Sequence, residues 1–383
     1  MARVIFVTAS LGHGGAERHA VALMNRLAER GHQCHAVYIK NSGDLLDRVR
    51  LRDGGTVRCL GAERYLDMRA LADFATHISR IGPSVIVAAN PYALMYSRLA
   101  LRRAGVHAPL VVTFHTTLLL SAKEWLQMLY YRPFFWAADC MVFVCERQRR
   151  YWLRRGVFSR RNELIHNGVD TEEFCDRWSP EERGRLRGAL GFSDADFVIG
   201  ISALLRPEKN HVQLVEAVAT LRKMGRPARA LMIGDGEMRG AIEARARELN
   251  VESDVVITGL QQEIRPYIAA CDAMALCSFT EAFSLAAIEA MAFCRPVVHS
   301  DVGGAAEMIL PGENGFLFPV GDTEALVDRL TRLLNRSDRE CMGTKAREMV
   351  EARFSERAMV DRYERMLLGL CQTPVPADEA VVH

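Results

Sequence analysis

Two glutamates eight residues apart, Glu281 and Glu289, flank the part of the sequence best suited to bind an anion. Glu281 is expected in a loop after an apolar strand, and Glu289 in the second turn of the helix that follows. The backbone amides of Ser284 and Leu285 would point out of that helix N-terminus, where a phosphate is favoured. Carboxylates on either side of such a group suit sugar hydroxyls rather than the phosphate itself.

Glu289 taken alone would be read as part of an exposed helix face, but its surroundings favour burial. Its neighbours over residues 285–293 are apolar on nearly every side of the expected helix. A carboxylate in a largely buried helix needs a polar partner, because burying it alone is costly. The pattern therefore predicts a buried glutamate close to the anion site.

Two cations follow the first strand expected in the second half of the chain. Arg206 and Lys209 lie three residues apart, at the carboxyl end of that strand and before a helix. Side chains of these types at this spacing can hold two oxygens of a diphosphate. A solvated basic turn in which Pro207 starts the helix is the alternative.

Two glycines and a histidine occupy similar positions in the first half of the chain. Gly14 and Gly15 follow the first strand, and glycine lets backbone amides approach an anion closely. Glu17 stands where a complete G-x-G-x-x-G fingerprint would have its third glycine, so a tight turn without a ligand is the alternative. His115 follows the fourth strand and can face a cleft, although core and surface positions are commoner for a histidine.

Short apolar, β-rich segments alternate with helix-length segments, which predicts parallel β-α-β units. The expected strands of the first half are 4–8, 34–38, 85–88, 110–114, 140–145 and 163–165. Those of the second half are 198–202, 230–233, 255–258, 273–277, 296–300 and 315–318. The expected helices include 16–29, 68–80, 211–224, 237–248, 284–292, 323–334, 338–351 and 355–370.

A polar, turn-rich stretch at about 170–195 interrupts this alternation and marks the domain boundary. The predicted fold class is α/β, with two doubly wound Rossmann-like domains, 1–178 and 179–354, facing a central cleft. Ligands of such sheets bind outside the carboxyl ends of the strands. A helix over 355–371 is expected to pack back toward the first domain, and 372–383 is expected to be a flexible tail.

Length and composition exclude several classes of protein. The 383 residues are 49% hydrophobic and 25% charged, as in globular proteins and unlike disordered or coiled-coil chains. No apolar run approaches the ~18 to 20 residues of a membrane-spanning helix, and the N-terminal run is too short for a signal peptide. The short N-terminal run therefore predicts a cytoplasmic location. The ten cysteines form no C-x-x-C pair, so we expect reduced thiols and no metal site.

Positive charge is concentrated in the first half of the chain. Residues 1–190 carry 28 Lys and Arg against 18 Asp and Glu, whereas the remainder carries 21 against 29. Seven arginines lie between Arg147 and Arg161, with aromatic residues among and before them. Such a segment suits the headgroup boundary of an anionic membrane, so peripheral attachment to its inner face is a hypothesis. A solvated helix is the alternative, and no motif indicates a nucleic-acid partner.

The motifs, taken together and in this order, resemble those of glycosyltransferase family 4, which are retaining enzymes of the GT-B fold. The resemblance extends from Val4 to about Leu370. Its most specific part is Glu281-x7-Glu289 within 280–292, and the other motifs lie at 12–17, 166–170, 207–211, 234–236, 296–307 and 312–317. It implies an acceptor-side first domain that faces a nucleotide-sugar-binding second domain, and a nucleotide-diphosphate sugar as donor.

The resemblance also implies roles for residues of the second domain. Lys209 and a nearby arginine would neutralise the diphosphate, which the amides of Ser284 and Leu285 would also hold. Glu289 would bind the ribose hydroxyls and Glu281 the donor sugar. Fixed positive groups of this kind stabilise a departing diphosphate, so the reaction would need no metal.

Other implied site residues come from both domains. Gly234 would belong to the donor-binding set. Gly14 and Gly15 would line the cleft beside sugar and phosphate, and His115 would lie beside the sugar and the acceptor. In the family's usual mechanism the departing phosphate oxygen takes the proton of the incoming hydroxyl, and both lie on the same face of the sugar.

Two details of the sequence bear on these assignments. The family often has an arginine where this chain has Leu204, and the sequence leaves open whether Arg206 takes its role. Asp194-x-Asp196 has the form of a metal-binding motif found in the other major glycosyltransferase fold. It lies far in sequence from every phosphate loop, so we do not expect it to bind a metal.

The predicted function is metal-independent transfer of a hexosyl or N-acetylhexosaminyl group from a UDP- or GDP-linked sugar. The acceptor would be a saccharide or a lipid-linked molecule in polysaccharide, lipopolysaccharide or glycolipid biosynthesis, and no separate cofactor is expected. A non-catalytic nucleotide-sugar-binding or scaffold subunit and a sugar-nucleotide 2-epimerase are the alternatives. The sequence leaves the sugar, the base, the acceptor, the linkage position and the oligomeric state open.

Overall fold

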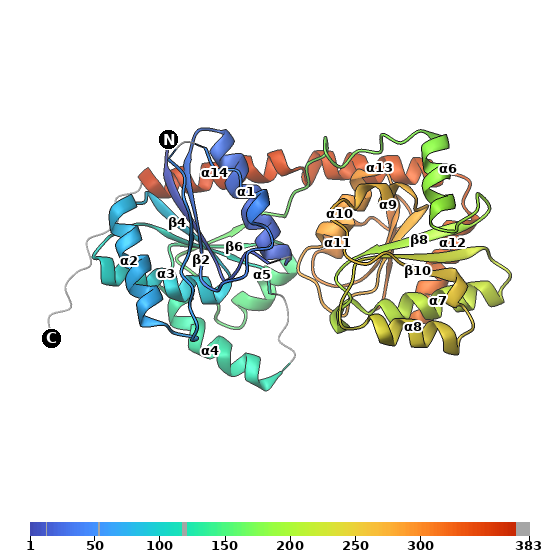
Figure 1. The fold of residues 1–383 in the computed structure, drawn as a ribbon, viewed down its shortest axis with the longest axis horizontal. Coiled ribbons are helices and arrows are strands. Elements are labelled where there is room, and N and C mark those ends of the chain that lie inside the picture. The colour runs from blue at the N-terminus through green and yellow to red at the C-terminus, as the bar shows by residue number, and fades with distance from the viewer. Residues whose placement is uncertain (13, 53, 117–120, 373–383) are drawn as a thin grey trace. The chain divides into compact units, whose positions relative to one another are not determined.

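The computed structural model describes residues 1–12, 14–52, 54–116 and 121–372. The chain divides into two compact units, each built on its own sheet (Figure 1). The first contains Met1–His166 and the chain from Met359 on, and the second contains Asn167–Ala358. This division lies before the boundary expected at 178–179. Apart from Gln372, the expected tail lies outside the described residues.

The first unit is built on seven parallel strands in the order β3-β2-β1-β4-β5-β6-β7. Their bounds are β1 (Arg3–Thr8), β2 (Gln33–Tyr38), β3 (Val57–Cys59), β4 (Val85–Ala89), β5 (Leu110–Phe114), β6 (Cys140–Phe143) and β7 (Arg161–Leu164). The strand order reverses between β1 and β4. Doubly wound sheets bind ligands at the carboxyl edge beside such a reversal.

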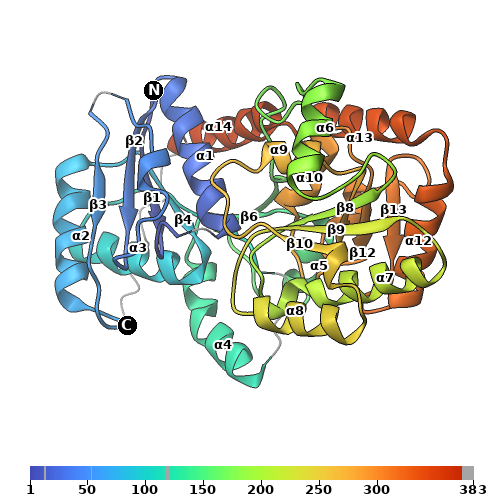
Figure 2. The ribbon, with the colours of Figure 1, turned by 45° about the vertical axis from the view of Figure 1, so that its right-hand side comes forward.

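Helices cover both faces of this sheet (Figures 1 and 2). They are α1 (Gly15–Glu29), α2 (Met68–Ile81), α3 (Asn90–Ala104), α4 (Ala122–Trp136), α5 (Glu146–Leu153) and α14 (Glu356–Gln372), with a short turn η1 (Leu46–Arg48). One core cluster joins α2, α3, α4 and α5 to the sheet, and a second joins α1 and α14 to it. The chain therefore closes its first unit with its last helix.

The last helix, α14, begins at Glu356 and belongs to the first unit from Met359 on. Its apolar residues recur every three or four positions, as in an amphipathic helix, and include Tyr363, Leu367 and Leu370. These side chains are buried in the same cluster as α1. Glu364, next to this apolar stripe, pairs with Arg30 at 2.7 Å.

The second unit is built on six parallel strands in the order β10-β9-β8-β11-β12-β13. Their bounds are β8 (Phe197–Ser202), β9 (Ala228–Ile233), β10 (Val255–Ile257), β11 (Ala273–Leu276), β12 (Val297–Ser300) and β13 (Gly315–Phe318). The helices are α6 (Pro180–Ala189), α7 (His211–Lys223), α8 (Arg239–Glu248), α9 (Arg265–Ala269), α10 (Leu285–Ala292), α11 (Ala305–Met308), α12 (Thr323–Asn335) and α13 (Arg339–Arg353), with turns η2 (Pro207–Lys209) and η3 (Glu252–Asp254).

The predicted strands and helices are confirmed, with ends that differ by at most two residues. The strand β3 was not predicted, because its three residues carry no apolar run and none of their side chains is fully buried. Both sheets are parallel and helix-covered, so the α/β fold class is confirmed. Among the helices of the described ranges, none has the length and apolar character needed to cross a membrane.

Candidate functional site

Lys209 and Glu281 form an ion pair at the carboxyl edge of the second sheet. Lys209 ends the turn η2 after β8, and Glu281 lies in the loop after β11. The strands β8 and β11 are neighbours in the sheet, although β9 and β10 separate them in the sequence. The pair therefore lies where the strand order reverses, with side chains that are only 25% and 20% exposed.

Two hydrogen bonds hold the loop that carries Glu281. The Phe279 N–H donates to the Glu208 carbonyl at 2.8 Å, which ties this loop to the turn that carries Lys209. The Asn167 amide donates from Nδ2 to the Phe283 carbonyl at 3.2 Å. Because neither hydrogen bond uses the side chain of Lys209 or Glu281, the loop is fixed independently of the ion pair.

The turn after β12 supports the same loop through its paired glycines. The Gly304 N–H donates to the Ala282 carbonyl at 2.8 Å. Gly303 has a φ of +51°, and a Cβ there would lie 2.1 Å from the Glu281 carbonyl oxygen. Only glycine fits both this backbone conformation and this close approach.

The helix α10 begins four residues after the ion-paired glutamate. Ser284 is its N-cap and accepts a hydrogen bond on Oγ from the Ala287 N–H at 3.2 Å. The first amides of the helix point out of its N-terminus, where the backbone dipoles favour an anion. Glu289 lies on the second turn and is 2% exposed, so its predicted burial is confirmed.

Gly234 and Arg206 differ in how tightly they pack at this edge of the sheet. A Cβ on Gly234 would lie 2.0 Å from the Ala203 carbonyl oxygen, so the loop after β9 packs directly on the loop after β8. Arg206 is 54% exposed and lies 4.0 Å from the Glu208 carboxylate. Its guanidinium is therefore on the solvent side of the turn, in reach of a ligand.

A buried histidine that sequence reasoning did not assign lies near the ion pair. His299 belongs to β12, and its Nδ1 lies 2.7 Å from the Ser300 carbonyl oxygen, which can only accept a hydrogen bond. Burial lowers the pKa of His299, while the Glu281 carboxylate acts in the opposite direction. The ring is thus neutral and carries its proton on Nδ1. Its place at a strand end before a glycine turn was the available sequence signal.

A second unassigned histidine, His211, is the first residue of α7. Burial lowers its pKa to about 4, and the ammonium of Lys209 acts in the same direction. A neutral imidazole adds no positive charge to the turn that holds Lys209. The charge available to an anion at this turn therefore comes from Lys209 and Arg206.

The glycines predicted in the first unit lie at the start of α1. Gly14 is the N-cap residue and Gly15 the first residue of the helix. A Cβ on Gly14 would lie 2.1 Å from the carboxylate of Glu17, whereas one on Gly15 would meet no other described atom within 4 Å. The backbone at Gly15 is therefore accessible from the carboxyl edge of the first sheet.

His115 follows β5 at the same edge. Its backbone N–H donates to Oδ1 of Asn90, a residue with a φ of +70° at the start of α3. Its ring centroid lies 5.0 Å from that of His19, one turn along α1 from Gly15. The structure thus gathers Gly14, Gly15 and His115 at one edge, and adds His19 and Asn90, which the sequence did not single out.

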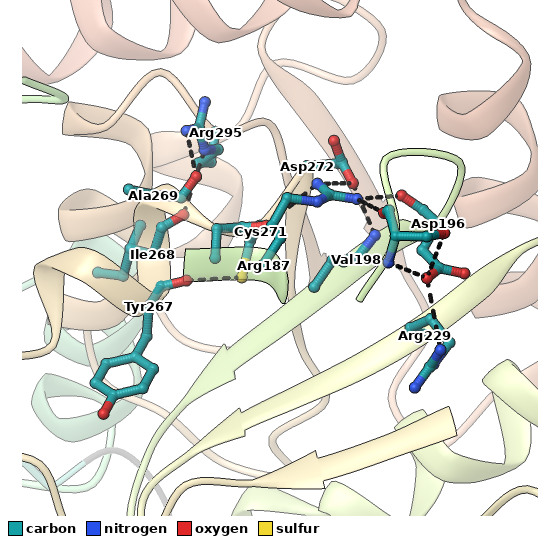
Figure 3. A network of polar contacts seen from close by, with 12 residues as sticks. Arg187, Asp196, Val198, Arg229, Tyr267, Ile268, Ala269, Cys271, Asp272 and Arg295 are labelled. Atoms are coloured by element: carbon teal, nitrogen blue, oxygen red, sulfur yellow. Dashed lines mark hydrogen bonds and ion pairs between the residues drawn. The ribbon is translucent and has the colours of Figure 1, made fainter. Parts of the chain in front are cut away.

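Asp196 belongs to the Asp194-x-Asp196 motif, which we did not expect to bind a metal. It lies at the amino end of β8 (Figure 3). Its carboxylate accepts from the Ser193 N–H at 2.7 Å and pairs with Arg229 at 3.5 Å. Beside it, Arg187 binds Asp272 at 3.1 Å. Within the part of the chain that the structure describes, no group of three or more His, Cys, Asp or Glu side chains is placed to hold a metal.

Both units are parallel Rossmann-like sheets with glycine turns at the carboxyl edge, and the second adds two cations and the N-terminus of α10 there, an arrangement typical of nucleotide-binding α/β proteins. Two family models match the chain: Glycosyltransferase Family 4 over 13–173, and Glycosyl transferases group 1 over 182–349. The chain belongs to glycosyltransferase family 4. It is therefore a glycosyltransferase that uses a nucleotide-sugar donor.

Individual relatives agree with this assignment. EpsD of Bacillus subtilis, which carries a provisional glycosyltransferase description, is 31% identical over 284 residues, or 71% of this chain and 73% of EpsD. LpsE of Rhizobium meliloti, a lipopolysaccharide core biosynthesis glycosyltransferase, is 27% identical over 92% of this chain and 96% of LpsE. The crystal structure of Anabaena HepE with UDP-glucose matches with a TM-score of 0.84 at 22% identity, over 96% of this chain and 100% of HepE. The fold is GT-B.

Proposed function

We propose that this enzyme transfers a hexosyl or N-acetylhexosaminyl group, with retention, from a UDP- or GDP-linked sugar to a saccharide or lipid-linked acceptor. The product would be a cell-surface polysaccharide, lipopolysaccharide or glycolipid. The observation that carries the proposal is the Lys209–Glu281 ion pair beside the N-terminus of α10. It supports the proposal because a cation suited to phosphate and a carboxylate suited to sugar hydroxyls lie in the loops next to the first amides of α10.

The roles proposed for the second unit follow from charge and burial. Lys209 and the exposed Arg206 neutralise the diphosphate, together with the amides of Ser284 and Leu285. Glu289, buried on α10, binds the ribose hydroxyls. Gly234 keeps the loop after β9 close enough to complete the donor pocket.

In the transfer, the bond between the anomeric carbon and the phosphate oxygen breaks as the bond to the acceptor oxygen forms on the same face. The departing phosphate oxygen takes the acceptor's proton, so the nucleoside diphosphate leaves as the other product. Glu281 orients the sugar through its hydroxyls. In the first unit, Gly15 opens the backbone beside the donor and His115 lies beside the sugar and acceptor.

The donor is tested by thermal shift and calorimetry with UDP-, GDP- and ADP-sugars, since a ligand that binds the folded protein stabilises it. We expect one nucleotide series to raise Tm, and Lys209→Met to weaken its binding by roughly tenfold to a hundredfold, the loss of one charge-assisted contact. Lys223→Met, at an exposed lysine on α7, is the control. Equal binding by both variants would contradict the proposed phosphate site.

Hydrolysis or transfer separates the proposed enzyme from its alternatives. Slow release of free sugar from the bound donor, lost in Glu281→Gln but kept in Glu248→Gln, would support a transferase. Binding without turnover under any acceptor would favour a scaffold subunit. Formation of a donor epimerised at C2 would favour the epimerase.

We also propose that the first unit attaches to an anionic membrane surface through α4. This helix stands out from the rest of the unit in both views (Figures 1 and 2). Its exposed residues include Leu126, at 70% exposure, with Leu129 and Tyr130 on nearby turns. Exposed apolar side chains at this spacing are typical of a helix face that enters the headgroup region.

Several arginines near α4 are bound to neighbouring side chains, and Arg154 is exposed to solvent. Arg149 and Arg150 both bind Glu146 at 2.9 Å, so their charges are partly neutralised. Arg155 stacks on the ring of Tyr151, 3.7 Å from its centroid. Arg154 is exposed and is the better candidate for a lipid phosphate.

Co-sedimentation with vesicles of phosphatidylcholine, with and without phosphatidylglycerol, tests the attachment. Leu126→Asp is expected to abolish binding to both, and Arg154→Glu to weaken only the anionic-lipid binding. Leu260→Asp, at an exposed leucine of the second unit, is the matched control. Binding by Leu126→Asp that equals the wild type would remove α4 from the proposal.

A further inference from the structure

A chain of polar contacts links the C-terminal helix to His115. The Tyr363 hydroxyl and Nε2 of His19 share a hydrogen bond of 3.2 Å. The His19 ring lies edge-on to the His115 ring, with centroids 5.0 Å apart and an interplanar angle of 61°. The three residues come from α14, α1 and the segment after β5, so tertiary packing alone brings them together.

Tyr363 and His19 lie in apolar surroundings, where burial of a hydroxyl and an imidazole costs free energy. Tyr363 is fully buried among Met, Leu and Val side chains of the core cluster that joins α1 and α14 to the sheet, and His19 is 3% exposed. A buried hydroxyl or imidazole without a partner costs about 1–3 kcal/mol. Apolar side chains would fill the same space without that cost, so simple packing does not account for the pair.

We propose that Tyr363 and His19 are positioning residues for His115. The Tyr363 hydroxyl fixes the orientation and the proton position of the His19 ring, and that ring in turn fixes the orientation of the His115 ring. The inference rests on the proposed place of His115 beside the donor sugar and the acceptor. It assigns a role in the reaction to two residues that lie inside the core.

Charge supports this arrangement. Burial lowers the pKa of His19, and His115 acts on it in the same direction; burial lowers the pKa of His115 to about 4. Burial also raises the pKa of Tyr363, with smaller effects from Cys140 on β6 and Arg362 on α14. All three groups are therefore neutral at pH 7. A neutral imidazole has one donor and one acceptor nitrogen, so its proton position must be set by a neighbour.

The backbone of His115 is also held in place. Its N–H donates to Oδ1 of Asn90 at 3.1 Å. The Nε2 atom of its ring is buried and makes no hydrogen bond within the described residues. No described residue therefore fixes the ring through Nε2, and the contact with the His19 ring makes the orientation of His115 sensitive to a change at His19.

The test uses Tyr363→Phe, which removes only the hydroxyl. Tyr96→Phe is the matched control, because Tyr96 is also fully buried in the first unit and its hydroxyl accepts from the Asp67 N–H at 2.8 Å. Ring 15N spectra of the full chain labelled on its histidines report proton position, and His115→Gln identifies the His115 signals. We expect Tyr363→Phe to move the His19 and His115 signals, and Tyr96→Phe to leave both unchanged.

Turnover of the nucleotide sugar found by the binding screen gives a second readout. We expect Tyr363→Phe and His19→Gln to lower kcat by about tenfold with the donor KM changed less than twofold, as for lost orientation of a reacting group. Unchanged His115 signals in Tyr363→Phe would overturn the positioning role. If the His115 signals move in Tyr363→Phe but the wild-type protein turns over no nucleotide sugar, the positioning role stands and the proposed function is overturned.

Discussion

The ammonium of Lys209 and the carboxylate of Glu281 bind each other across two neighbouring strands of the second sheet. Both groups are assigned to different parts of the same donor, the diphosphate and the sugar. Donor binding must therefore exchange this pair for two new contacts. Under the proposed roles, the residue that holds Lys209 in the free enzyme is the one that binds the donor sugar, and this has a measurable consequence.

Glu281→Gln is expected to bind UDP or GDP itself more tightly than the wild type does, because a nucleotide without sugar no longer competes with the carboxylate for Lys209. An increase of roughly threefold to tenfold corresponds to about 1 kcal/mol, the upper range for a partly exposed ion pair. Turnover of the full nucleotide sugar should fall at the same time. Calorimetry with the nucleotide that the screen selects checks the first effect, and Glu248→Gln should change neither. Weaker nucleotide binding in Glu281→Gln would contradict the exchange.

Gly303→Ala is expected to weaken donor binding beyond its effect on stability. The added Cβ would lie 2.1 Å from the Glu281 carbonyl oxygen, so the loop that carries this glutamate must move. Gly312→Ala is the matched control, since Gly312 also has a positive φ, of +84°, but a Cβ there meets no described atom within 4 Å. Both variants should lose about 1–2 kcal/mol from the left-handed backbone. Only Gly303→Ala should also lose donor affinity in titration calorimetry.

Acid should destabilise the first unit through His77. Burial, with smaller effects from Arg58 and Arg80, lowers the pKa of His77 to about 4. The unfolded chain therefore binds the proton first, so this contribution to stability is present above about pH 6.5 and is lost as pH falls toward 4. Urea unfolding at pH 7 and pH 5 should show a loss of stability to which several buried histidines contribute, and His77→Gln should reduce that loss by on the order of 1 kcal/mol. His107→Gln, at an exposed histidine, should keep the wild-type pH dependence.

Arg187→Met should destabilise the second unit without altering the donor site. The Arg187 guanidinium is buried, binds the Asp272 carboxylate at 3.1 Å and donates to backbone carbonyls around Asp196 (Figure 3). Removing the guanidinium leaves a carboxylate that is 32% exposed and three backbone carbonyls without this donor, which should cost about 1–3 kcal/mol. Arg185→Met on the exposed side of the same helix should cost less than about 0.5 kcal/mol. Equal urea midpoints for the two variants would show that the network contributes little.

The fold could be predicted because its parallel strands are short apolar runs with helical segments between them, such as Leu110–Phe114 before α4. Loop positions followed directly, so Lys209, Glu281 and His115 were placed at strand ends. The pairing of Lys209 with Glu281 could not be read from the sequence. It requires β11 to lie next to β8 in the sheet, in addition to β9. The same limit hid His19, whose partner Tyr363 lies 344 residues away.

Charge was the second limit. The sequence predicts an arginine-rich segment between Arg147 and Arg161 that suits an anionic surface, yet the structure pairs several of its arginines with acidic neighbours. Arg150 binds Glu146, and Arg160 binds Asp139 at 3.3 Å. Glu146 is within helical range and could have been anticipated, whereas Asp139 precedes β6 and meets Arg160 only when the strands pair. A count of charges therefore overstates the free positive surface.

The return of α14 to the first unit has a consequence for synthesis on the ribosome. Strands β1 to β7 leave the exit tunnel long before the helix that covers one of their faces, since Met359 follows His166 by the whole of the second unit. Domains generally fold in the order of translation. Here the second unit, although its residues are translated later, can fold before the first. The apolar partners of Tyr363 and Leu367 stay uncovered until translation reaches α14. A nascent chain arrested before Met359 is expected to recruit chaperones through that face.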